Sequence, residues 1–527
     1  MGTNFALPKA LSEEVSMLTA LPRYDELYVV SDIHMGGRPG FQIFHQGARL
    51  GRLIRSLTRA RPEEPEEEVA LVLNGDVIDS LAEDIRGYIA MEDAVSMMDR
   101  IYRDPAFSPV WDALAEFVKT RHRSLVIVLG NHDLEMALPH VEYSIRRRLA
   151  EGDDAAQGRI SFSTRGGGHA CRVGKARVLC THGNEVDDWN AVDYDLLARL
   201  ASAINADRPV PLSEWTPNPG TRLVVDVMNA VKRKHPFVDL LKPETKAVAP
   251  VLLVLDPELV RQVSSVLPIL GGKIRGAFKT GKLLSDDSPG IEAVSDSGAA
   301  AEVALEQLLG PSLRAAVGEA RPRGTLEDEL LAVERNFAAG RSSAEPASGE
   351  TLGWPGMVVD RLRGIDKVQA LRRALKDWLE DDPTFDPATR DETFHRVTGR
   401  VGKDVDFIVT GHTHLERAIR IDADVDRFYY NCGTWVRLLR FTDRVLSDEA
   451  AFADVFDAMS AGRMEELDET SIPGPNGGRD PLILTRSTVV KISSRPEGVL
   501  GELCHVGDEG EDGVTLETVA GSKFRRR

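Results

Sequence analysis

The sequence is poor in cysteine. Four cysteines occur in 527 residues, and none of them has the paired spacing of the ligands in a structural zinc site. So few cysteines, far apart in a long chain, indicate reduced residues of the core and hence a reducing compartment. We therefore expect a cytoplasmic protein.

Long apolar runs are also missing. No stretch of about 18 apolar residues occurs, which argues against a membrane-spanning helix. The longest apolar stretch, Ala247–Leu255, is too short and contains a proline. The segment Met1–Leu21 contains acidic residues and has no basic start followed by an apolar run, so we expect no signal peptide. These absences predict a soluble protein.

The chain has no excess of positive charge and few aromatic residues. Its formal net charge of −18 argues against binding to duplex nucleic acid, because such binding depends on neutralising phosphates. The aromatic content of 6% disfavours the stacking platforms that bind single-stranded nucleic acid. A metal site could still recruit a small anion, because bound ions are the largest local charges.

What the sequence does contain is a repeated pattern of an apolar run followed by a polar turn. Continuous runs of Val, Ile and Leu of this length indicate strands covered on both faces, as in α/β sheets. Ligand-binding groups gather beyond the carboxyl ends of such strands, which is where all the polar turns lie. The five segments are Leu27–Asp32, Val69–Asp76, Leu125–Asp133, Ala176–Gly183 and Val405–His414.

Helical patterns at Gln46–Arg61, Met91–Arg103 and Val110–Arg121 alternate with the first three runs and predict a mainly parallel sheet. More than two hundred residues separate the fourth run from the fifth, which is too long for a loop in a compact domain. Helical periodicity recurs through this interval. It therefore predicts a large, mainly helical insertion or cap.

These patterns predict the order of domains along an α/β chain. We expect a first part of the core over residues 22–188, the insertion over residues 189–400, and a second part of the core over residues 401–500. Residues 501–527 are expected to form a C-terminal tail, because the chain closes on a basic run that is typical of a frayed, solvated end.

The first three polar turns carry metal-binding residue types. Asp32 and His34 lie two apart on an extended segment, so both side chains project to one side and can bind one ion. Asp76 can bridge two cations through its two oxygens, and Asn131 offers a neutral oxygen ligand. Asp79 follows Asp76 in the sequence Gly-Asp-Val-Ile-Asp, and both a position behind the ligands and a helix cap are open for it.

The fourth and fifth turns add His182, in Thr-His-Gly, and the pair His412 and His414, in Gly-His-Thr-His. A mixture of carboxylate, imidazole and amide ligands favours Mn²⁺, Fe or Zn²⁺ over Mg²⁺, which prefers oxygen ligands. The third turn also contains His132 and Asp133. We expect His132 to act as an acid towards the leaving group or to stabilise the phosphoryl oxygens, with Asp133 fixing its tautomer.

Taken together, the five blocks resemble the calcineurin-like metallophosphoesterase superfamily. They are Asp-x-His, Gly-Asp-x-x-Asp, Gly-Asn-His-Asp, a lone His-Gly and Gly-His-x-His, in this order and at strand ends. The resemblance covers Leu27–His182 and Val405 to about Phe441. It implies two packed mixed β-sheets flanked by helices.

The same resemblance implies how two divalent metal ions are shared among the ligands. One ion would be held by Asp32, His34 and His414, with Asp76 bridging to the second. The ligands of the second ion would be completed by Asn131, His182 and His412.

Two segments, Ser31–Gly36 and Tyr430–Trp435, are similar to the branch that contains UDP-2,3-diacylglucosamine pyrophosphatases. That branch carries arginine at the position of His132, and its members have a small cap where this chain has a large insertion. For these reasons we do not transfer the lipid substrate of that branch to this chain.

The sequence therefore predicts hydrolysis of a phosphate ester or anhydride by a hydroxide that bridges two metal ions. The substrate would be a phosphorylated small molecule or a nucleotide, and phosphatase, phosphodiesterase and pyrophosphatase activity all stay open. Two further readings also stay open, namely a nuclease on single-stranded nucleic acid and a metal-stabilised scaffold or sensor without turnover. The oligomeric state is not specified.

Overall fold

The structure is a computed structural model, which describes residues 21–59, 66–83, 85–210, 215–242, 251, 254–255, 366–379, 385–439, 441–474, 477–510 and 513–527. They belong to two compact units. The first consists of Met1–Val225, Phe385–Arg437 and Thr485–Arg527, and the second of Asp226–Thr384 and Leu438–Leu484. Most of the central part of the predicted insertion, residues 256–365, lies outside the described residues.

The larger sheet of the first unit has eight strands in the order β17-β16-β15-β2-β3-β4-β5, with β18 beside β16. Neighbours from β2 to β5 run parallel, as the alternating strand and helix patterns predict. The strands from β15 onward pair antiparallel. The bounds are β2 (Glu26–Val30), β3 (Val69–Asn74), β4 (Arg123–Val128), β5 (Ile160–Ser163), β15 (Thr488–Arg495), β16 (Gly498–Glu509), β17 (Gly513–Thr518) and β18 (Phe524–Arg526).

The smaller sheet has six strands in the order β1-β6-β7-β8-β10-β9. The inner neighbours β7, β8 and β10 are parallel, so their carboxyl ends lie on one edge. The bounds are β1 (Arg23–Tyr24), β6 (His169–Val173), β7 (Ala176–Cys180), β8 (Phe407–Thr410), β9 (Glu416–Arg420) and β10 (Phe428–Cys432).

Alternating side chains on the strands of the larger sheet face two separate cores. On β2, Leu27 and Val29 pack between the two sheets against residues of the smaller sheet such as Phe407. Tyr28 and Val30 point the other way, into a core shared with the helices. Because both faces are covered, every residue of β2, β3 and β8 is buried. The two packed sheets flanked by helices confirm the predicted fold class.

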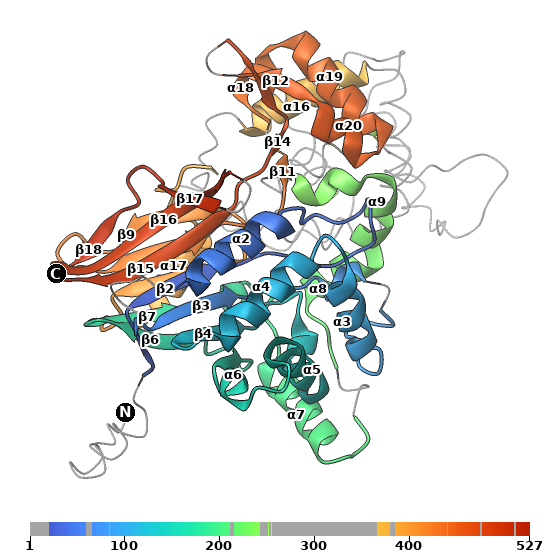
Figure 1. Ribbon diagram of the computed structural model, residues 1–527. Helices are drawn as coiled ribbons and strands as arrows, with labels where there is room; N and C mark the ends of the chain where they lie inside the picture. The colour runs from blue at the N-terminus through green and yellow to red at the C-terminus, as the bar shows by residue number, and fades with distance from the viewer. Residues whose placement is uncertain are drawn as a thin grey trace, which may run out of the picture. The chain divides into compact units, whose positions relative to one another are not determined.

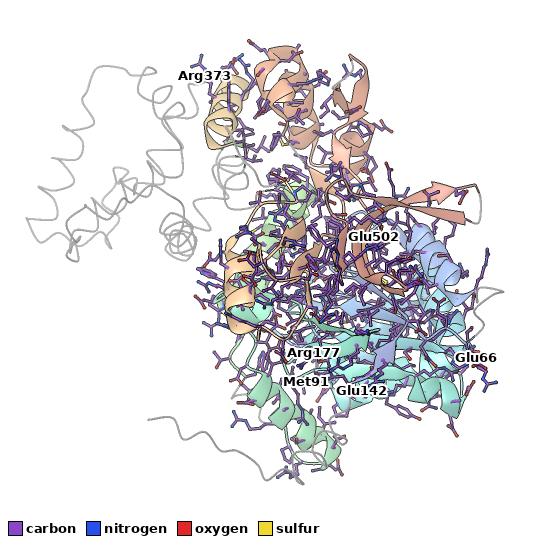
Figure 2. All side chains as sticks on the ribbon, turned by 90° about the vertical axis from the view of Figure 1, so that its left-hand side faces the viewer. Glu66, Met91, Glu142, Arg177, Arg373 and Glu502 are labelled. Atoms are coloured by element: carbon purple, nitrogen blue, oxygen red, sulfur yellow. The ribbon has the colours of Figure 1, made fainter. Side chains whose placement is uncertain are left out.

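Helices cover the outer faces of both sheets (Figure 1). The larger sheet is covered by α2 (Gly47–Thr58), α3 (Ala94–Arg103), α4 (Ser108–Lys119) and α5 (Pro139–Ala150). On the smaller sheet, Phe394 and Val397 of α17 (Glu392–Arg400) pack on Ile408 and Tyr429. Figure 2 shows side chains filling the space between the strands and the helices of this unit. The other helices of the first unit are α6 (Asp154–Gly158), α7 (Tyr194–Asn205) and α8 (Pro219–Leu223).

The C-terminal residues are part of the larger sheet and do not form the tail that the sequence predicts. Strand β18 pairs antiparallel with β16, with Val499 opposite Arg526. The ring of Phe524 stacks on that of Phe428 at 5.0 Å between centroids, and Arg526 binds Asp406 at 2.7 Å. Backbone pairing and these contacts, which involve residues distant in sequence, hold the basic run in place.

The second unit is mainly helical in its described part. Its helices are α9 (Asn229–Lys234), η6 (Pro236–Leu240), α16 (Lys367–Leu379), α18 (Asp443–Ser447), α19 (Glu449–Ala461) and α20 (Met464–Glu469). Two short antiparallel pairs accompany them, β11 (Leu438–Leu439) with β14 (Ile483–Leu484) and β12 (Ser471–Pro473) with β13 (Arg479–Pro481).

The unit boundaries depart from the predicted domains at both ends of the insertion and within the second part of the core. Residues 438–484, expected within the core, cluster with the second unit, whereas α7, α8 and α17, expected in the insertion, belong to the first. Helix α17 belongs to the first unit because its apolar side chains pack on the smaller sheet. Sequence periodicity shows that a helix has an apolar face but not which sheet this face contacts. None of the described helices has both the length and the apolar character needed to cross a bilayer.

Candidate metal centre

The predicted ligands follow strands of both sheets and meet at the strand ends. Asp32 and His34 come after β2, and Asp76 comes directly after Gly75 at the end of β3. The smaller sheet contributes His182 after β7 and His412 after β8. Because neighbouring parallel strands end on the same edge, two packed sheets can present their turns to one another.

The first group of side chains consists of Asp32, His34 and His414, whose ligand atoms all lie within 4.8 Å of one another. Nε2 of His34 lies 3.1 Å from Nε2 of His414, and the latter atom lies 3.3 Å from Oδ1 of Asp32. All three side chains are at least mostly buried. This convergence of two imidazoles and one carboxylate is a ligand set for a divalent ion.

Asp76, His182 and His412 form the second group within the same limit. Oδ2 of Asp76 lies 3.1 Å from Nε2 of His182 and 3.7 Å from Nε2 of His34, so this carboxylate faces both groups. Nδ1 of His182 lies 2.8 Å from the carbonyl oxygen of Asn74. A proton on Nδ1 therefore donates to Asn74 and leaves Nε2 available for a metal.

Asn131 lies in the turn after β4, beside Asp76. The main-chain N–H of the next residue, His132, donates to Oδ1 of Asp76 at 2.9 Å. Oδ1 of Asn131 is buried and has no hydrogen-bond partner among the described residues. A buried amide oxygen in this position would be costly to leave unpaired. The residues of the site thus fit a divalent cation, because such an ion would be a partner for Oδ1 of Asn131.

Asp79 connects a third group, which contains His34 and His132. Oδ1 of Asp79 lies 3.0 Å from Nδ1 of His132, and Oδ2 lies 3.7 Å from Nδ1 of His34. The same carboxylate caps the short helix η1 (Ser80–Ala82) by accepting from Ala82. Both of the roles left open for Asp79 therefore occur together.

Asp133 has a different partner from the one predicted. Its two oxygens accept main-chain N–H groups, from Val77 at 2.8 Å and from Gly130 at 2.7 Å. Asp133 is fully buried and ties the third turn to the second. The carboxylate at Nδ1 of His132 is that of Asp79, so the predicted orienting role of Asp133 is corrected in favour of Asp79.

The ligand-bearing backbone is held in an unusual conformation. Five of the predicted ligands have positive φ angles between 52° and 71°, a region that costs roughly 1–2 kcal/mol for a residue with a Cβ. Such strain persists only where the surrounding structure enforces it, and it clusters at functional sites. The five residues are Asp32, His34, Asp76, His412 and His414.

Two glycines let the turns approach one another. Gly75 has a φ of 87°, and a Cβ there would lie 2.3 Å from Nδ1 of His182. A Cβ at Gly130 would lie 2.1 Å from Oδ1 of Asp76. Any larger residue at either position would displace a ligand of the second group.

The segment after β10 fixes the main chain of Asp32 by two hydrogen bonds. Oγ1 of Thr434 donates to the carbonyl oxygen of Asp32 at 2.9 Å, and the N–H of Trp435 donates to the same oxygen at 3.1 Å. The N–H of His412 donates to the Asp32 carboxylate at 3.0 Å. The first turn, the fifth turn and the Gly-Thr-Trp segment are thereby locked together.

Charges in the centre are strongly coupled. Burial disfavours a charged His182, but the carboxylates of Asp76 and Asp32 outweigh it and raise the pKa of His182 to about 10. Burial opposes ionisation of Asp76 as well, yet the neighbouring imidazoles of His182 and His132 hold its pKa well below the usual range. In the metal-free protein, protonated His182 thus supplies part of the positive charge that a bound cation would otherwise provide to the carboxylates.

Sequence reasoning missed Asp187. Its Oδ2 lies 3.0 Å from Nε2 of His412, although Asp187 belongs to none of the five blocks. It lies five residues beyond His182, in the loop that includes the short helix η3 (Asn184–Val186). A carboxylate shortly after the His-Gly pair was a visible signal, but only the fold brings it to His412.

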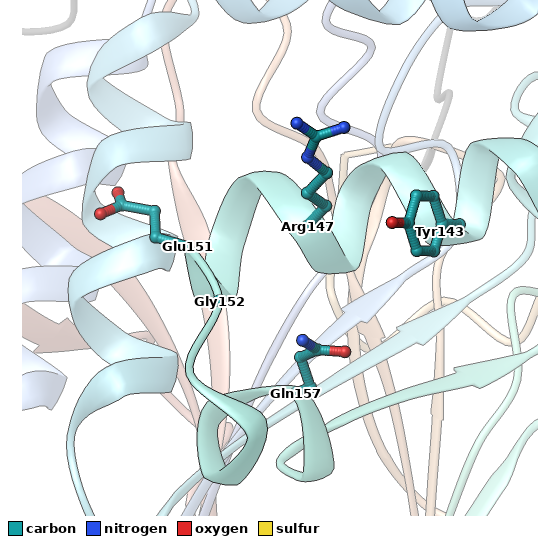
Figure 3. Close-up of a pocket in the computed structure, with 5 residues that line it drawn as sticks. All are labelled: Tyr143, Arg147, Glu151, Gly152 and Gln157. Carbon is teal, nitrogen blue, oxygen red and sulfur yellow. The ribbon is translucent and has the colours of Figure 1, made fainter.

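A hollow of about 480 Å³ lies elsewhere on the first unit, along α5 and α6 (Figure 3). It is lined by Tyr143, Arg147, Glu151, Gly152 and Gln157. None of these residues is a predicted site residue or a member of the three metal-binding groups. The hollow therefore shares no residue with the three metal-binding groups.

The comparison with known families agrees with this geometry. Residues 26–239 match the family model of calcineurin-like phosphoesterases, and no match was found among curated proteins. The matched segment contains every predicted ligand except His412 and His414, which the fold brings to the same centre. Residues 26–239 are therefore similar to the calcineurin-like phosphoesterases, the family that the polar turns of the sequence predict.

Proposed function

We propose that this protein is a phosphoester hydrolase that works with two divalent metal ions. The observation that carries the proposal is the convergence of buried carboxylates and imidazoles in overlapping groups, with Asp76 facing two of them. One ion would be held by Asp32, His34 and His414. The other would be held by Asn131, His182 and His412, with Asp76 between the two.

Bound cations would supply Lewis acidity and activate water for attack on a phosphoryl group. The protein's own part is to fix the ligands and to offer a proton. His132 suits the second task, because its side chain is 19% exposed while Asp79 beside it is buried. Burial opposes ionisation of Asp79, but His132 and His34 outweigh it and keep the pKa of this carboxyl well below its usual range.

A fixed carboxylate at Nδ1 turns Nε2 of His132 away from Asp79. Nε2 can then donate a proton to the leaving oxygen of a phosphate ester or anhydride. This arrangement favours an enzyme over a metal-stabilised scaffold, because a scaffold needs the ligands but has no use for an oriented, partly exposed imidazole.

We further propose that Mn²⁺, Fe or Zn²⁺ is the native metal, since four of the seven ligands are imidazoles. A phosphorylated small molecule or nucleotide is the proposed substrate class. All four cysteines are buried and free, and this supports our proposal of a reducing compartment such as the cytoplasm.

A substrate panel tests the proposal. The protein would be stripped with a chelator, reconstituted with Mn²⁺ or Zn²⁺, and assayed on p-nitrophenyl phosphate, bis-p-nitrophenyl phosphate, nucleoside phosphates and single-stranded oligonucleotides. Turnover that requires metal and disappears in Asp76→Asn is expected. Cleavage of oligonucleotides alone would select the nuclease, and no turnover with full metal occupancy would select the scaffold.

A further inference from the structure

Asp187 is held in one orientation by its own loop. Its Oδ1 accepts the main-chain N–H of Trp189 at 2.9 Å, and its Oδ2 accepts from Nδ2 of Asn190 at 2.6 Å. The same Oδ2 lies 3.0 Å from Nε2 of His412. Two bonds within the loop thus direct the carboxylate at one nitrogen of the histidine.

That contact determines which nitrogen of His412 can bind an ion. If Nε2 carries the proton donated to Asp187, the lone pair of the neutral ring lies on Nδ1. His412 belongs to the group with Asp76 and His182, so Nδ1 is the atom left for that group. A carboxylate behind a metal-binding histidine fixes the tautomer and strengthens the ligand.

The loop itself is fastened from both sides. A guanidinium N–H of Arg396 donates to the carbonyl oxygen of Val186 at 2.7 Å, and Arg400 donates to that of Glu185 at 3.0 Å. Both arginines belong to α17. On the other side, the carboxylate of Glu185 accepts the hydroxyl of Thr181 at 2.8 Å and the N–H of Gly183 at 2.7 Å.

We propose that Asp187 is a positioning residue for His412 and hence for one of the two ions. It holds Nε2 of His412, and α17 keeps the loop that carries it in place. The inference rests on the proposed function, because it assumes that His412 binds a metal. It adds a residue outside the five sequence blocks and ties the helix that precedes β8 to the metal centre.

Metal binding to the full chain tests this directly. Mn²⁺ would be titrated into metal-free wild type, Asp187→Ala and Asp187→Asn, with free Mn²⁺ followed by electron paramagnetic resonance and a competing chelator. We expect wild type to bind two ions. In Asp187→Ala one of the two affinities falls by about 10- to 100-fold while the other is unchanged.

Asp187→Asn keeps an acceptor oxygen but loses the charge, so a smaller loss is expected for the same ion. Asp195→Asn is the matched control, because it removes one charge from an exposed residue eight positions further along the chain. Circular dichroism would establish that each variant is folded, and if Asp187→Ala is not, Asp187→Asn serves in its place.

Each outcome has a definite meaning. Two unchanged affinities in a folded Asp187 variant would overturn the inference and leave the proposed function intact. Equal losses in Asp187→Asn and Asp195→Asn would overturn it too, because they would reduce the effect to general charge. A wild-type protein that takes up no ion would instead overturn the proposed function, and the inference with it.

Discussion

Oδ1 of Asp79 lies 3.0 Å from Nδ1 of His132, while Oδ2 of the same carboxylate lies 3.7 Å from Nδ1 of His34. One buried side chain thus stands behind both a proposed metal ligand and the proposed acid. Asp79 thereby links the two roles, whereas His132 is not one of the proposed ligands, so its role can be tested by mutation without removing a ligand.

His132→Ala is expected to keep both ions and to lose most turnover, by about 10²- to 10⁴-fold in kcat. Asp79→Asn should lower kcat less, because His132 remains but is no longer held by a charge. If the two act as a unit, the double variant will be no slower than His132→Ala alone. Steady-state kinetics with measured metal content checks this, and near-normal turnover of His132→Ala at full occupancy would contradict it.

Asp133→Ala should act on stability. Removing the carboxylate leaves the buried N–H groups of Val77 and Gly130 unpaired, and each unpaired buried group costs about 1–3 kcal/mol. The free energy of unfolding is expected to fall by roughly 2–6 kcal/mol in urea titration. Asp195→Ala, at an exposed position of the same unit, is the control with little expected loss. A stable Asp133→Ala would show that this tie between the turns is dispensable.

Metal uptake should release a proton. Without metal, the pKa of His182 is raised to about 10 from 6.5, so the ring is protonated at neutral pH, and an ion must displace that proton. The apparent affinity for Mn²⁺ is therefore expected to rise with pH, by up to about tenfold per unit for each proton released. Calorimetric titrations in buffers of different ionisation enthalpy would count the protons. An affinity that does not change between pH 6.5 and pH 8.5 contradicts the expectation.

The same pKa has a consequence for the stability of the metal-free protein. Because the folded-state pKa of His182 lies above the unfolded value, its contribution is fully present below about pH 6.5. It is lost as pH rises through about 10. Urea titrations of the stripped protein across this range follow it, and His182→Gln is expected to flatten this part of the profile.

Phe524→Ala tests whether the C-terminal strand contributes to the fold. The ring stacks on Phe428 at 5.0 Å and lies 5.8 Å from Tyr430, so its removal is expected to lower the free energy of unfolding by about 1–3 kcal/mol. Arg525→Ala, at an exposed position of the same strand, is the control with little expected effect. Equal stability of the two variants would show that the ring of Phe524 does not stabilise the fold.

The strand ends and the polar side chains that follow them could be read from the chain because both are local. An apolar run marks a doubly covered strand, a glycine permits the sharp turn after it, and the residues that follow must lie at that strand's carboxyl end. Parallel neighbours then bring distant turns such as those of Asp32 and His412 to one place. The α/β fold, the helices α2, α3 and α4, and the order of the polar turns were accessible in this way.

Other features depend on directions that no local pattern encodes. Asp79 and Asp133 are equally good partners for His132 in the sequence, and only the path of each turn sends one to the ring and the other to main-chain amides. Asp187 reaches His412, 225 residues away, because β7 and β8 are neighbours. The last strand joins its sheet through backbone pairing, which depends on which edge is open and not on composition.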